Sequence, residues 1–239
     1  MGSASLGTGT SIRHQFIYSN PSFGMRLGQI IAKHKDVQLH TPRVRLLTIW
    51  FGANDAALPG FRQHVPISRF SENLTTMVRA IRTPESPWYS PETKIFLITP
   101  PPIHVPSMRA DMQPTREFDN TRAYADEVKK VGEAEGVPVV DAWTGVWEAA
   151  GKDREVVKEF LTDGLHLGKA GYEVSQTIGL NSSTVTLLQV VFASLEKAII
   201  QQYPELYHEK LQSVFPYSDY FHNHTLEEFK AEDWLDKRS

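Results

Sequence analysis

The chain has 239 residues, of which 41% are hydrophobic, and a formal net charge of -3. This composition suits one domain with a single core, and the charge gives no general attraction to nucleic acid or to anionic membranes. The sequence contains no cysteine, which excludes disulfides, thiol catalysis and cysteine metal sites. No stretch approaches the roughly 20 apolar residues of a transmembrane helix. Residues 1–15 lack the apolar core of a signal peptide, so we expect a cytoplasmic protein with no membrane span.

Three short apolar runs are predicted to be β-strands. They cover residues 44–50, 94–99 and 137–140 and are rich in β-branched or other apolar side chains. In parallel sheets, ligands bind at the carboxyl ends of the strands. The residues to examine for chemistry are therefore those that follow the runs, namely Gly52 to Asp55, Thr99 to Pro102 and Asp141 to Trp143.

Two segments between these runs have the periodicity of amphipathic helices. Residues 68–82 place on one face the apolar side chains Phe70, Leu74, Met77, Val78 and Ile81. Residues 116–135 do the same with Phe118, Ala125, Val128 and Val131, and Gly136 fits a helix C-cap. Strands that alternate with helices predict an α/β fold, a three-layer α/β/α sandwich with a parallel sheet.

The C-terminal part is less regular. Residues 175–189 are uncharged and rich in Ser and Thr, and they interrupt a segment that otherwise has a helical pattern. They are either an insertion or an ordinary long loop. Residues 217–239 are aromatic and charged, which indicates a surface tail after a single domain of residues 1–216. His222 and His224 could bind a metal, but the tail offers no third ligand.

Two short patterns carry chemistry. Asp163 precedes His166 by three residues, so its carboxylate can hydrogen-bond the imidazole, fix its tautomer and stabilise the imidazolium. Gly52 and Asn54 directly follow a predicted strand. An Asn amide can donate to an oxyanion, and a glycine lets a substrate approach the backbone. Taken alone, the first pattern is more often structural, and the second is more often a simple turn.

In their order and spacing, these residues resemble the SGNH or GDSL-type hydrolases, which have a flavodoxin-like fold. Gly52, Asn54 and Asp55 match the family's Gly-x-Asn-Asp block, and Asp163 and His166 match its Asp-x-x-His block. The chain is most similar to the isoamyl-acetate-hydrolysing esterases. Similarity to that subfamily's landmarks occurs at residues 51–58, 63–66, 97–100, 140–143 and 161–167.

The N-terminal part departs from the family pattern. The family's nucleophile is the serine of a Gly-Asp-Ser turn after the first strand, and the nearest match makes Ser11 the candidate, with Thr10 in place of aspartate. A Gly/Ser-rich start in which Ser11 has no role is an equal alternative. No apolar run precedes Ser11, and no glycine lies between Gly28 and Gly52, where the family has a second oxyanion donor. We therefore expect a sheet that is incomplete at its N-terminal side.

The resemblance implies a serine esterase acting on short-chain acyl esters such as acetates. Ser11 would attack, His166 would take its proton, Asp163 would orient His166, and Gly52 and Asn54 would bind the oxyanion or substrate. It implies a small-molecule ester partner, no metal and no organic cofactor. The N-terminal departures leave a catalytically inactive protein of the same fold as the alternative. A nucleotide-binding protein fits less well, because no P-loop or Gly-x-Gly-x-x-Gly pattern occurs.

Overall fold

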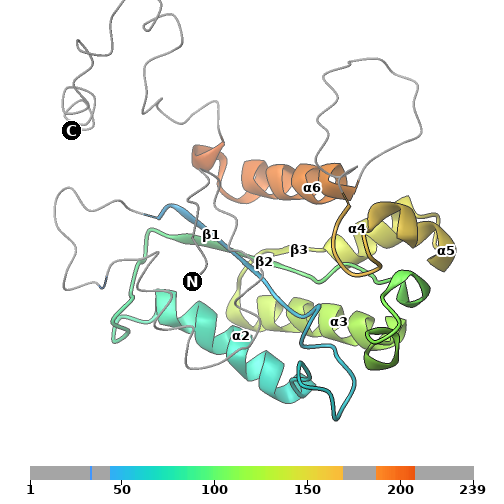
Figure 1. Ribbon diagram of the computed structural model, residues 1–239. Coiled ribbons are helices and arrows are strands. Elements are labelled where there is room, and N and C mark those ends of the chain that lie inside the picture. The colour runs from blue at the N-terminus through green and yellow to red at the C-terminus, as the bar shows by residue number, and fades with distance from the viewer. Residues whose placement is uncertain (1–32, 34–43, 169–186, 208–239) are drawn as a thin grey trace, which may run out of the picture. The chain divides into compact units, whose positions relative to one another are not determined.

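A computed structural model describes Lys33 and residues 44–168 and 187–207 (Figure 1). The chain divides into two compact units, residues 1–198 and residues 199–239. The domain boundary expected at residue 216 and the expected tail lie outside the described residues.

A parallel sheet organises the first unit (Figure 1). Its strands lie in the order β1-β2-β3 and comprise Leu46–Trp50, Lys94–Ile98 and Val139–Val140. β1 pairs with β2 in a register that sets Leu46 opposite Lys94, and β2 pairs with β3 with Leu97 opposite Val139. The predicted α/β class and parallel sheet are confirmed. Each observed strand is one or two residues shorter than the predicted run.

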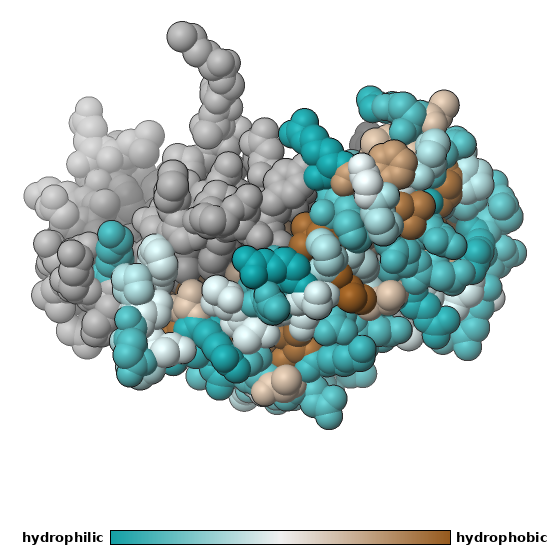
Figure 2. Space-filling model, turned by 90° about the horizontal axis from the view of Figure 1, so that it is seen from below, coloured by the Kyte–Doolittle hydropathy of each residue, from teal (hydrophilic) through white to brown (hydrophobic). Residues whose placement is uncertain are grey.

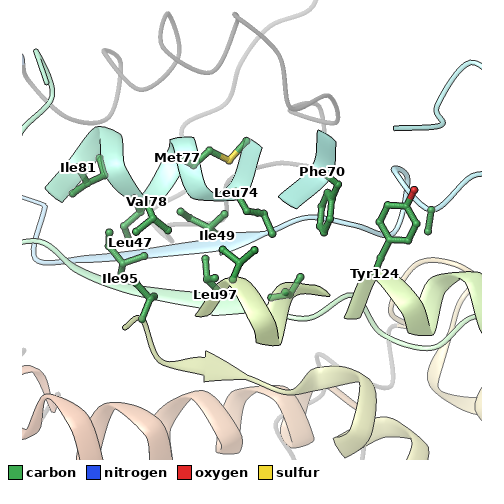
Figure 3. Packing of buried hydrophobic residues seen from close by; sticks show 14 residues of the cluster. Leu47, Ile49, Phe70, Leu74, Met77, Val78, Ile81, Ile95, Leu97 and Tyr124 are labelled. Atoms are coloured by element: carbon green, nitrogen blue, oxygen red, sulfur yellow. The ribbon is translucent and has the colours of Figure 1, made fainter. Parts of the chain in front are cut away.

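Helices α2, Ile67–Arg82, and α3, Phe118–Glu135, pack on one face of this sheet (Figure 3). Leu47 and Ile49 of β1 lie on that face, because alternate strand residues point to the same side. The five apolar side chains predicted to share a face of α2 are all buried in this core. The exposed side of the two helices is mainly hydrophilic (Figure 2), as an amphipathic helix requires.

The central strand β2 is buried on both faces. Ile95 and Leu97 belong to the core shared with α2 and α3, while Phe96 and Ile98 are 0% and 3% exposed on the other face. A strand covered on both sides reads as a continuous apolar run rather than an alternating one. This explains why the segment Lys94–Ile98 lacks the period-two pattern.

The end of α3 is fixed by two glycines. Gly136 has φ +59 and caps the helix in the left-handed conformation, as predicted. A Cβ on Gly132 would lie 2.2 Å from Cγ2 of Val139, so only glycine lets the last turn of α3 approach β3 this closely. The short connection between α3 and β3 depends on both positions.

The remaining described helices connect or follow the sheet. They are the α-helices α4, Ala142–Ala149, α5, Arg154–Val157, and α6, Leu187–Gln202, and the 3₁₀ helices Val105–Ser107, Gln113–Thr115, Lys158–Phe160 and Pro204–Leu206. The last three residues of the suspected insertion, 187–189, begin α6, and residues 175–186 lie outside the described part. Within the described residues, no helix is long and apolar enough to span a bilayer.

Candidate active site

The loop that carries Asp163 and His166 closes on itself. Leu161 and Leu167 form an isolated antiparallel bridge, and the Thr162 N–H donates to the His166 carbonyl at 2.8 Å. The Thr162 hydroxyl donates to the same carbonyl at 3.1 Å. These bonds give the loop a defined shape although it lies outside any long helix or strand.

Gly164 lets this loop lie against the chain that follows β2. It has φ +80, and a Cβ there would lie 2.3 Å from the carbonyl oxygen of His104. The His104 N–H donates to the Gly164 carbonyl at 2.8 Å. A side chain at this position would meet both backbone strain and a direct clash. Glycine is therefore required where the two segments touch.

Leu165 joins the same loop to the segment after β1. Its buried side chain packs with Ile103 and Met108, and Ala53 packs against this small cluster. Ala53 stands between Gly52 and Asn54 in the predicted Gly-x-Asn-Asp block. The two motifs identified from the sequence are thus held by one apolar cluster at the carboxyl ends of β1 and β2.

Asp163 and His166 form a hydrogen-bonded pair. The Nδ1 atom of His166 lies 2.8 Å from Oδ2 of Asp163. The other carboxylate oxygen accepts from the backbone N–H groups of Leu165 at 3.1 Å and of His166 at 2.8 Å. Each side chain is 50% exposed, so solvent and small molecules can reach the pair.

These bonds also favour the ionised form of Asp163. Partial burial alone would raise the pKa of Asp163, but the hydrogen bonds from His166 and Leu165 and the charge of the His166 ring outweigh it and lower the pKa. An ionised carboxylate can only accept, so Nδ1 of His166 carries its hydrogen. Nε2 is then the basic nitrogen, the one that can take a proton from a hydroxyl.

The turn after β1 requires Gly52. This residue has φ +115, and a Cβ would lie 3.0 Å from Cγ of Pro100 and 3.3 Å from Cζ of Phe70. The Gly52 N–H donates to Oδ2 of Asp55 at 3.2 Å, and its carbonyl accepts from the Ala56 N–H at 2.9 Å. Asp55 therefore closes the turn that presents Asn54.

Asp55 is a buried carboxyl group with an incomplete set of partners. It is 1% exposed, and its Oδ1 atom has no hydrogen-bond partner among the described residues. Burial raises the pKa of Asp55 to about 6, although hydrogen bonds from backbone N–H groups and the charge of Arg116 act in the opposite direction. Burial and the neighbouring Asp55 together raise the pKa of Tyr124 to about 12.

The side-chain amide of Asn54 is held through its oxygen. Oδ1 accepts from Nε2 of Gln63 at 3.2 Å and from Nη2 of Arg116 at 3.4 Å. Among the residues that the structure describes, no acceptor takes a hydrogen bond from Nδ2 of Asn54. The donating end of the amide is therefore the one available to a ligand, as an oxyanion site needs. The sequence gives no indication of a role for Arg116, and Gln63 belongs only to residues 63–66, one of the stretches that resemble the esterase subfamily.

The polar side chains that follow β2 and β3 form hydrogen bonds and an ion pair within the protein. The Thr99 hydroxyl donates to Oδ1 of Asp141 at 3.3 Å and accepts from the Trp143 N–H at 2.9 Å. Oδ2 of Asp141 pairs with Nζ of Lys129 at 2.8 Å. Burial would raise the pKa of Asp141, but Lys129 and Thr144 outweigh it and lower the pKa. These polar groups anchor the start of α4.

The structure describes four of the five predicted site residues. Gly52 and Asn54 follow β1, and the loop of Asp163 and His166 packs on the same cluster through Leu165. Ser11 lies outside the described residues. Nowhere in residues 44–168 and 187–207 do three His, Asp or Glu side chains gather as a metal site would require.

The chain is similar to known lipases and esterases. The GDSL-like lipase/acylhydrolase family model matches residues 13–174. A GDSL esterase/lipase of Arabidopsis thaliana is 34% identical over 137 residues, which are 52% of this chain and 53% of that protein. An isoamyl acetate-hydrolyzing esterase 1 homolog of Bos taurus is 34% identical over 134 residues, 53% of this chain and 51% of that protein. The chain spans about half the length of the curated relatives it matches.

Solved structures to which the chain shows similarity include two bacterial proteins. A lipase/acylhydrolase from Enterococcus faecalis superposes with a TM-score of 0.44 at 28% identity, covering 64% of this chain and 62% of that one. An acetylxylan esterase from Geobacillus stearothermophilus superposes with a TM-score of 0.44 at 19% identity, covering 73% and 66% of the two chains.

Proposed function

Because the chain belongs to the GDSL-like lipase/acylhydrolase family, we propose that it is a serine esterase that hydrolyses short-chain acyl esters such as acetates. The observation that carries the proposal is the Asp163–His166 pair, with 2.8 Å between carboxylate and imidazole. Leu165 packs this loop on the cluster that also contacts Ala53, the residue before Asn54. Acetate esters are supported by relatives named isoamyl acetate-hydrolyzing esterase homologs.

The proposed reaction is acyl transfer through the serine. The hydroxyl of Ser11 attacks the ester carbonyl while Nε2 of His166 takes its proton, and the ring then gives that proton to the leaving alcohol. Asp163 stabilises the imidazolium that forms between these two steps. Nδ2 of Asn54 and the backbone N–H of Ser11 donate to the oxyanion. Water, activated by the same histidine, then releases the acid.

We expect turnover to be slow in this chain. The residue before the proposed nucleophile is Thr10 rather than aspartate, and no glycine between Gly28 and Gly52 can supply the second backbone donor of the family. Loss of one oxyanion donor typically lowers turnover by ~10²–10³-fold. The same departures favour the second candidate, a catalytically inactive protein of the same fold.

Labelling with a fluorophosphonate separates these candidates. An activated serine hydroxyl displaces fluoride from phosphorus and keeps the probe, and mass spectrometry of the digested protein then identifies the labelled residue. We expect the label on Ser11, and we expect His166→Ala to prevent it. A label on another serine would reassign the nucleophile, and the absence of any label would support the inactive protein.

The acyl specificity needs its own measurement. The p-nitrophenyl esters of acetate, butyrate and octanoate differ only in the length of the acyl chain. We expect kcat/KM to be highest for acetate and to fall with chain length. A rise toward octanoate would contradict the short-chain proposal without affecting the assignment of the catalytic residues.

A further inference from the structure

A buried arginine, Arg116, contacts the oxygen of the Asn54 side-chain amide. Arg116 is 4% exposed, and its Nη1 donates to the carbonyl of Thr115 at 3.2 Å and to the hydroxyl of the same residue at 2.9 Å. Its Nη2 donates to Oε1 of Gln63 and, at 3.4 Å, to Oδ1 of Asn54. Because Nη1 is fixed on Thr115, the planar guanidinium cannot rotate away from the two amides.

The chemistry of arginine determines how both amides point. A guanidinium has donors and no acceptor, so the group of Gln63 that faces Arg116 must be its oxygen. The Nε2 end of Gln63 is then directed at Asn54, whose oxygen must face it. With Oδ1 engaged by two donors, Nδ2 of Asn54 is directed away from them. The buried Arg116 cation therefore determines which end of each of the two side-chain amides, that of Gln63 and that of Asn54, is the oxygen.

We propose that Arg116 and Gln63 are positioning residues that set the direction and the donor strength of the Asn54 amide. The proposal rests on the proposed role of Asn54 as an oxyanion donor. Hydrogen bonds that are donated to Oδ1 draw electron density from the amide and make the N–H groups on Nδ2 stronger donors. A fixed positive charge in a buried environment also favours negative charge beyond the amide, and it needs no reorganisation when the oxyanion forms.

Gln63→Glu tests the orientation directly. Gln63 is half-buried in the loop between β1 and α2, so the fold should tolerate the change. The new carboxylate can still accept from Arg116, but it cannot donate to Oδ1 of Asn54. We expect the Asn54 amide to turn over and donate Nδ2 to this carboxylate. The oxyanion then loses its donor, and kcat should fall by about 10²-fold with little change in KM.

Gln113→Glu is the matched control. Gln113 is also half-buried, and its Nε2 donates to the carbonyl of Met108 at 2.9 Å rather than to the Asn54 amide. It introduces the same negative charge without touching Asn54, so kcat should stay at the value of the unchanged protein. Arg116→Lys keeps the positive charge and removes the planar fork, and it should lower kcat in the same way as Gln63→Glu.

A spectroscopic readout makes the result independent of turnover. The side-chain amide signals of ¹⁵N-labelled protein include that of Asn54, which is assigned by its disappearance in Asn54→Asp. We expect this signal to move in Gln63→Glu and to stay in place in Gln113→Glu. If the unchanged protein hydrolyses no ester, the proposed function fails while this signal still tests the positioning role. An Asn54 signal that does not move in Gln63→Glu, or a kcat that does not fall in an active protein, would overturn the inference.

Discussion

Nδ1 of His166 lies 2.8 Å from Oδ2 of Asp163, and the backbone N–H of the same histidine donates to the other carboxylate oxygen at 2.8 Å. The imidazole ring and the backbone N–H of His166 thus each bind a different oxygen of the Asp163 carboxylate. Because the two residues are three apart on a closed loop, the pair forms from local chain geometry alone. The packing of Leu165 against Ile103 and Met108, by contrast, requires the tertiary fold.

Asp163→Asn should separate the role of the charge from that of the shape. An amide that presents its NH₂ group to Nδ1 of His166 favours the wrong tautomer and cannot stabilise the imidazolium. We expect kcat/KM for p-nitrophenyl acetate to fall by about 10²–10⁴-fold. Asp153→Asn is the control, because this exposed carboxylate also accepts a backbone N–H, from Glu155 at 2.8 Å. Equal losses in the two variants would refute a catalytic role for Asp163.

Gly164→Ala should destabilise the catalytic loop. Both the φ of +80 and a Cβ 2.3 Å from the His104 carbonyl oppose alanine there. Gly151 has a similar φ of +63 with nothing within 4 Å of a Cβ, so Gly151→Ala isolates the backbone strain of about 1 kcal/mol. We expect Gly164→Ala to lower the free energy of unfolding by a further 1–3 kcal/mol or so, as measured by urea denaturation. The contact with His104 would be unimportant if the two losses were the same.

Asp55 should make the protein less stable as pH rises from about 4 to 6. Its pKa is raised to about 6 in the folded protein, so between these values the folded state binds more protons than the unfolded state. The free energy of unfolding then falls with rising pH and levels off above about 6, a change on the order of 3 kcal/mol.

Asp55→Asn should remove this slope. Its amide oxygen can still accept the Gly52 N–H that now binds Oδ2, so the turn is retained while the titration is lost. Urea unfolding of both proteins at a series of pH values measures the difference. Identical pH profiles would show that the Asp55 carboxyl group does not titrate in this range.

Much of the fold could be predicted from periodicity. The apolar faces of α2 and α3, the runs that became β1 and β2, and the cap at Gly136 all depend on residues close together in the sequence. The short helix α4 was not predicted, since its eight residues give too little periodicity. The family resemblance was confirmed by the match over residues 13–174.

The site could be predicted only in part. The spacing of Asp163 and His166 anticipates their hydrogen bond, because the contact is local, while their catalytic role stays a prediction. Arg116 and Asn54 are 62 residues apart, and no local pattern indicates that the packing of α3 against the sheet brings them together. The role of Ser11, the cytoplasmic location and the domain boundary at residue 216 stay predictions as well.

Hydrolysis of p-nitrophenyl acetate by the purified protein, beside its Ser11→Ala and His166→Ala variants, tests the central claim most directly. We expect a slow enzyme, with kcat below the usual range of about 1–10³ s⁻¹, because the proposed nucleophile Ser11 follows Thr10 rather than an aspartate and no glycine occurs between Gly28 and Gly52. Both substitutions should abolish this turnover. Turnover that survives His166→Ala, or no turnover in the unchanged protein, would contradict the proposal of a slow serine esterase.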